Sequence, residues 1–169
     1  MPPHLLALFT KGLLMGKILA ACPITIPLRI TNEDRQNVVV MEDINKAIKS
    51  SARTITKTKL SDRICSEDVL RKANLKCLNE AVASITAITV WKSKQSMDPL
   101  GQCLFHDKPK SRVTRLTTSK DIPQPVPGYP MLASNVMARV WNCIPDLRNA
   151  ATLGAAKAIC RKWAKTVPR

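Results

Sequence analysis

The chain has 169 residues, 45% of them hydrophobic, so it can bury a core and is not disordered throughout. Only five glycines occur, which argues against an all-β fold rich in hairpins. Lysine and arginine number 27 against 12 acids, and a net charge of +15 attracts polyanions, nucleic acid first and anionic membranes second. The plain alternative is a lysine-rich surface that serves only solubility.

Residues 1–37 are expected to form an apolar N-terminal helix followed by an extended segment that contains prolines. The helix is predicted over 5–21, apolar on nearly all sides and therefore mostly buried. Pro23 and Pro27 break it. Lys11 and Lys17 interrupt the apolar run, so it reads neither as a signal peptide nor as a membrane span. A mitochondrial presequence stays open, because no acid precedes Glu33, although Arg and Ser are not enriched.

Residues 38–105 are expected to form a helical region, and its clearest amphipathic helix runs from 42 to about 57. One face of this helix is apolar, and it carries Ile44, Ile48, Ala52 and Ile55. The opposite face is basic, and it carries Lys46, Lys49, Arg53 and Lys57. Because the apolar face is expected to be buried, the pattern predicts that the row of cations on the opposite face is exposed to solvent.

Two more helices are predicted in this region. Ser66 is expected to cap a short helix that ends with Asn74 in a left-handed conformation. A longer helix follows over 77–96, and residues 98–101 end it. Its buried stripe is predicted to consist of Leu78, Ala81, Val82, Ile85 and Ile88.

Residues 106–132 are expected to form a basic, proline-rich strap or linker. Four prolines in residues 123–130 favour an extended path. Lys110, Arg112 and Arg115 precede them and are candidates for phosphate contacts.

Residues 133–169 are expected to form a C-terminal pair of helices. Ser134 is predicted to cap the first, Pro145 to close the turn, and Thr152 to cap the second. The apolar seam of the last helix is predicted to hold Leu153, Ala156, Cys160 and Trp163. Its polar side carries Lys157, Arg161 and Lys165, and Trp141 and Trp163 are expected to be buried against each other's helices.

The sequence therefore predicts a mostly α fold, an irregular helical assembly with a proline-rich extended segment. The candidate nucleic-acid-binding residues are Lys46, Lys49, Arg53, Lys57, Lys110, Arg112, Arg115, Lys157, Arg161 and Lys165. Such contacts would position phosphates without reading sequence.

No catalytic centre is expected. The acid pairs 33–34, 42–43 and 67–68 have helix-start or turn explanations, so no catalytic residue, metal or cofactor is predicted. Cys103 and His106 form half of a zinc pattern, and a site that adds Cys65 and Cys77 is a minor alternative to structural thiols. The six cysteines form no CxxC pair and are predicted to be reduced, intracellular thiols.

Three motifs appear in an order that resembles the C-terminal tail of non-LTR retrotransposon reverse transcriptases. Residues 52–55 (ARTI) match a helix core, residues 65–70 (CSEDVL) a helix start, and residues 141–145 (WNCIP) a turn. The chain departs from the pattern at Asn74, where Gly is usual, and at residues 155–157 (AAK), where the family has Phe-Lys. The family's Y-x-D-D polymerase motif has no counterpart.

The resemblance implies a non-catalytic fragment from the region that follows the polymerase palm, able to contact template RNA or target DNA. The expected partners are RNA or DNA and the polymerase portion of a reverse transcriptase, with no membrane span. The alternatives are a scaffold element that packs on a polymerase and binds nothing itself, and a basic protein of membrane surfaces or organelles. The expected location is intracellular, nuclear or cytoplasmic, with the mitochondrion left open.

Overall fold

The structure, a computed structural model, describes residues 2–17, 19–20, 28–31, 34, 38–96, 98–105 and 132–168. The described residues form helices and no strand, which confirms the predicted fold class. In chain order the α-helices are α1 (Pro3–Phe9), α3 (Val38–Thr56), α4 (Ser66–Lys72), α5 (Leu78–Ser96), α6 (Pro99–Phe105), α7 (Ala133–Cys143) and α8 (Leu153–Ala164). A π-helical stretch, η1 (Thr10–Met15), continues α1, and short 3-10 turns, η2 (Leu60–Asp62) and η4 (Pro145–Asn149), precede α4 and α8. The predicted strap of 106–132, with Lys110, Arg112 and Arg115, lies outside the described residues apart from Leu132.

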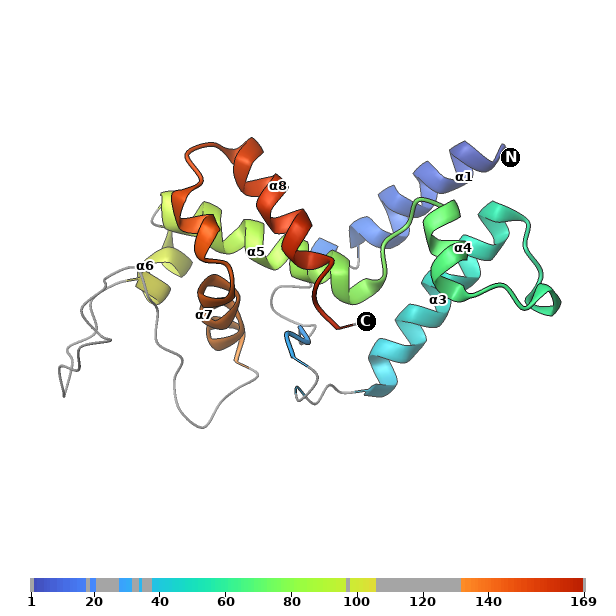
Figure 1. Ribbon diagram of the computed structural model, residues 1–169, viewed down its shortest axis with the longest axis horizontal. Helices are drawn as coiled ribbons and strands as arrows, with labels where there is room; N and C mark the ends of the chain where they lie inside the picture. Colours follow the sequence, from blue (N-terminus) through green and yellow to red (C-terminus); the bar gives the residue numbers. More distant parts are fainter. Residues whose placement is uncertain are drawn as a thin grey trace.

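Helix α5 is the central element: α3, α6, α7 and α8 pack against it, whereas α1 and α4 pack mainly on α3 (Figure 1). Helix α5 is buried on more than one side, and several of its buried side chains are small: Ala81, Ala83, Ser84 and Ala87. Helix α8 lies across α5 and offers small side chains in turn: Ala156, Cys160 and Ala164. Small residues on both helices permit close approach of the two backbones. The buried stripe predicted for α5 was too narrow, because α5 is buried on more than one side. The prediction was wrong for Ile85 and Ile88, which are only half-buried.

Helices α3 and α4 pack together at one end of α5, and α1 lies against α3. The apolar face predicted for α3 is confirmed for Ile48, Ala52 and Ile55, which are buried, whereas Ile44 is only half-buried. The first turn begins at Val38, earlier than expected. Asn74 has the predicted left-handed backbone, with φ of 53°, directly after α4. Ser66 is not the N-cap of α4, since the helix begins at that residue and Cys65 precedes it without a side-chain cap.

Helices α6 and α7 pack at the other end of α5. Here Phe105 and Trp141 meet edge to face, with ring centroids 5.0 Å apart. Trp141 is 2% exposed, whereas Trp163 on α8 is half-buried. The prediction that Trp141 and Trp163 are buried against each other's helices was wrong, because α7 and α8 each pack mainly on α5 rather than on one another. Ser134 does not cap α7, but Thr152 does cap α8, accepting a hydrogen bond from the Ala155 N–H at 3.2 Å.

Two sets of partly buried polar contacts tie residues 28–31 and Asp34 to the helices. The Asn79 side chain on α5 accepts a hydrogen bond from the Arg29 N–H at 3.1 Å and donates to the Arg29 and Pro168 carbonyls at 2.9 and 2.6 Å. The Asp34 carboxylate accepts from the backbone N–H groups of Ile30 and Thr31, and from the Arg139 guanidinium on α7 at 2.7 Å. These hydrogen bonds hold residues 28–31 and Asp34 against the helices, although these residues form no helix or strand themselves.

The N-terminal helix differs most from its prediction. Only Thr10 and Met15 are buried in α1 and η1, whereas Leu5, Leu8, Phe9 and Leu13 are exposed. The sequence is apolar on nearly all sides, but among the described helices α3 is the main neighbour of α1, and a single neighbour covers only one side of a helix.

Candidate nucleic-acid interface

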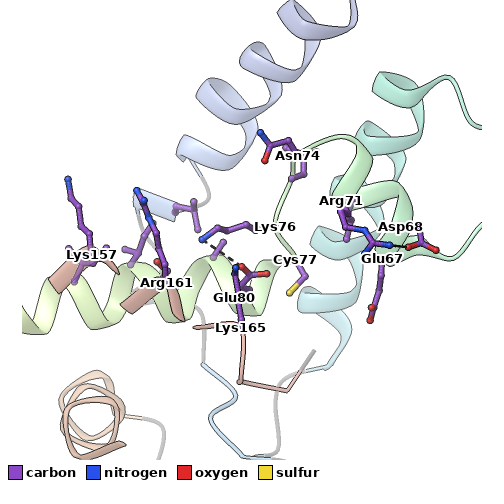
Figure 2. A pocket seen from close by; sticks show the side chains of 17 residues that line it. Glu67, Asp68, Arg71, Asn74, Lys76, Cys77, Glu80, Lys157, Arg161 and Lys165 are labelled. Atoms are coloured by element: carbon purple, nitrogen blue, oxygen red, sulfur yellow. Dashed lines mark hydrogen bonds and ion pairs between the residues drawn. The ribbon is translucent and has the colours of Figure 1, made fainter. Parts of the chain in front are cut away.

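An open cleft of about 980 Å³ lies between α4, α5 and α8 (Figure 2), and Leu19 also lines it. Its floor is apolar, and the residues that form it are Leu70, Leu75, Ala81, Ile85 and Ile88. Ile85 and Ile88 are thus only half-buried because they face this cleft. Charged side chains stand around the floor, as the labelled residues in Figure 2 show.

Helix α8 contributes a row of three cations to the rim: Lys157, Arg161 and Lys165. Each follows directly after one of the residues that α8 buries against α5, namely Ala156, Cys160 and Ala164. One residue turns the helix by about 100°, so the same periodicity that buries the small residues places the cations along the edge of the contact. All three are exposed, and the row is about 12 Å long at a rise of about 1.5 Å per residue. Of the described carboxylates, none forms an ion pair with them.

The opposite rim is nearly neutral. Asp68 on α4 pairs with Arg71 on the same helix, and Glu80 on α5 lies 3.7 Å from the Lys76 Nζ. Glu67 also lies on this side of the cleft. The positive charge of the cleft is therefore concentrated on α8, and Asp68 and Glu80 pair with cations of their own side.

The second predicted row, on α3, is not continuous. Lys46 pairs with Asp43 at 3.1 Å, and Lys49 is exposed. Arg53 is half-buried and donates to the carbonyls of Lys59 and Ile64 at 3.2 and 3.5 Å, so it holds the loop that follows the helix. Lys57 stands beyond the end of α3 with φ of 54°, so the prediction that it continues the helical row was wrong. None of these four residues lines the cleft.

The structure thus brings together three predicted cations in one cleft and keeps the α3 cations apart from it. Arg71 and Lys76 also line the cleft and were not among the candidates. Each lies outside an amphipathic pattern, so no local signal singles it out. The three predicted cations of the strap lie outside the described residues.

The described acids and thiols have structural surroundings. Asp34, Asp43 and Asp68, one from each acid pair, form ion pairs with a neighbouring cation. Cys65, Cys77, Cys103, Cys143 and Cys160 are free thiols, and Cys22 and His106 lie outside the described residues. Contrary to the expectation of buried structural thiols, Cys65, Cys103 and Cys143 are exposed. Over the described ranges no three His, Cys, Asp or Glu side chains gather in a way that could hold a metal ion.

The comparisons with known proteins give no match: no protein-family model, no curated protein and no solved structure is significantly similar to this chain. Within the part of the chain that the structure describes, no helix has the length and hydropathy needed to cross a bilayer.

Proposed function

We propose that this chain binds RNA or single-stranded DNA without sequence preference and has no catalytic centre of its own. The observation that carries the proposal is the row of Lys157, Arg161 and Lys165 along one rim of the cleft, exposed and separate from the acids of the opposite rim. Lysine and arginine side chains bind phosphates by displacing condensed counterions, a contribution that needs no base recognition.

The shape of the cleft favours a single strand over a duplex. Its apolar floor lies beside the cation row, so unstacked bases can cover Ile85 and Ile88 while their phosphates meet α8. A duplex keeps its bases stacked inside and presents only phosphates, which leaves this floor without a partner. None of the described residues that line the cleft is aromatic, so the contribution of base contacts is expected to be small.

The resemblance to reverse transcriptase tails supports the same class of ligand, and a fragment of such a tail is the origin that we propose for this chain. The expected partner would then be RNA or DNA held by a neighbouring polymerase portion. The scaffold alternative, in which the chain packs on a polymerase and binds nothing, makes the opposite prediction for the isolated chain.

The test compares two variants that lose the same charge. One carries Lys157→Gln, Arg161→Gln and Lys165→Gln on α8, and the other carries Lys46→Gln, Lys49→Gln and Lys57→Gln at α3. Glutamine preserves helix propensity, and Arg53 is left in place because it holds the loop after α3. Binding of a mixed-sequence RNA oligomer and of a matched duplex is measured by fluorescence anisotropy over a series of salt concentrations.

We expect the α8 variant to bind the RNA more weakly and with a flatter salt dependence. Three lost phosphate contacts reduce the slope of log K against log salt by about 2, at about 0.7 per contact on a single strand. The α3 variant should change less. Equal losses in the two variants would mean that net charge alone binds RNA, and unchanged binding in the folded α8 variant would reject the cleft and favour the scaffold alternative.

A further inference from the structure

The N-terminal helical stretch exposes a continuous apolar face. The exposed fractions are 46% for Leu5, 62% for Leu8, 56% for Phe9 and 46% for Leu13. Single exposed apolar residues are ordinary, but four large ones within nine residues of one helical stretch form a patch, and such patches mark interaction surfaces.

The remaining side of the stretch is already occupied. Thr10 and Met15 are buried, and Leu6, Ala7 and Leu14 pack against the core. The stretch therefore has one face committed to the protein and another that no described residue covers. Helix α1 projects at the edge of the molecule, where Figure 1 shows it above α3 and α4.

The charge of this region identifies the kind of surface that would cover the patch. No acid occurs before Glu33, and the exposed Lys11 and Lys17 belong to the same helical stretch. A surface that is complementary to it must be apolar in depth and negative at its edge. A bilayer with anionic headgroups has that arrangement, and interfacial helices combine large apolar side chains with lysines in this way.

We propose that α1 and η1 dock the protein on anionic membrane surfaces, lying in the headgroup region with Leu5, Leu8, Phe9 and Leu13 inserted. Lys11 and Lys17 remain at the level of the lipid phosphates. This surface is distinct from the α8 cation row, so the inference does not depend on the proposed binding of nucleic acid.

The test measures sedimentation of the full chain with vesicles of phosphatidylcholine, alone or mixed with phosphatidylserine. The variant carries Leu8→Ser and Phe9→Ser, which remove the two most exposed side chains of the patch. The matched control carries Leu60→Ser and Leu153→Ser, two leucines exposed elsewhere, at 79% and 37%. We expect the wild type and the control to bind the anionic vesicles, and the patch variant to bind at least about tenfold more weakly.

A second variant, Phe9→Trp, keeps the patch apolar and reports on insertion directly. Brominated anionic lipids should quench the emission that the added indole contributes beyond the three native tryptophans. Three results would overturn the proposal: no quenching of that emission, equal binding by the patch variant and the control, or a wild-type dimer that the patch variant dissociates. The last would show that a second copy of the chain covers the patch.

Discussion

Replacing Gly101 with alanine tests how closely α6 approaches α5. A Cβ atom at this position would lie 2.1 Å from the Ser93 carbonyl oxygen and 2.8 Å from its carbonyl carbon. Both atoms belong to the backbone of α5, so no side-chain rotation can relieve the contact. Helix α6 must move by about 1 Å or more, because close-packed interiors do not tolerate such an overlap. That movement also strains the contact in which Ser93 Oγ donates to Asp98 at 3.1 Å.

The expected change in the free energy of unfolding follows from two opposing contributions. Overpacking of this kind costs up to about 3 kcal/mol, whereas alanine gains about 1 kcal/mol over glycine in helix propensity. We therefore expect Gly101→Ala to destabilise the protein by about 2 kcal/mol, measured by urea unfolding followed by far-UV circular dichroism.

Gly154→Ala is the matched control, because Gly154 also lies in the first turn of a helix. Its added Cβ would meet nothing closer than the Thr152 hydroxyl at 3.9 Å. This variant should be as stable as the wild type or more stable by up to about 1 kcal/mol. A Gly101→Ala protein that is as stable as the Gly154→Ala protein would show that α6 does not approach α5 in this way.

Three further predictions concern single side chains. Trp141→Ala should cost about 3 to 5 kcal/mol of stability, and Trp163→Ala clearly less, because only Trp141 is fully buried; equal losses in thermal unfolding would contradict this. Burial raises the pKa of Asp34, but hydrogen bonds from the Thr31 N–H, the Arg139 guanidinium and the Ile30 N–H outweigh it and hold that pKa below its ordinary value of 3.8. The ionised Asp34 thus stabilises the fold at pH values above 3.8, and this stabilisation is lost as the pH falls through the lowered pKa. The difference in unfolding free energy between the wild type and Asp34→Asn should therefore disappear in acid. A difference that does not depend on pH would refute this reasoning. Burial raises the pKa of the Cys160 thiol to about 11, so alkylation of the folded protein followed by mass spectrometry should modify it far more slowly than the exposed Cys65; equal rates would count against its burial.

Local sequence signals predicted the helices well where the feature depends on the spacing of residues within one helix or at its end. The apolar stripe of α3, the left-handed Asn74 and the Thr152 cap all depend on residues within a few positions of one another. The predicted caps at Ser66 and Ser134 failed for a related reason. Serine is one of the preferred N-cap residues, but packing of the helix decides at which residue the first turn begins, and α4 and α7 begin so that Cys65 and Leu132 occupy the cap positions.

For the cations of the candidate site, the helical pattern predicted exposure correctly on α8 but not at Arg53 on α3. Periodicity predicted Lys157, Arg161 and Lys165 on the polar side of α8, and all three are exposed. It predicted Arg53 as an outward cation in the same way, but the loop after α3 returns to that side chain and accepts its hydrogen bonds. A helical pattern shows which way a side chain leaves its own helix, and it cannot show what another segment brings to meet it.

By itself, the sequence determined that this protein is helical, strongly basic and interrupted by prolines, because composition and short-range spacing carry those properties. Only the tertiary structure decided which faces are covered. It made α5 central through small residues on α5 and α8, opened a cleft over Ile85 and Ile88, and left Leu8 and Phe9 exposed on a helix that the pattern predicted to be buried. The physical reason is that burial depends on two elements at once: an apolar side chain is buried only where a neighbouring helix packs against it.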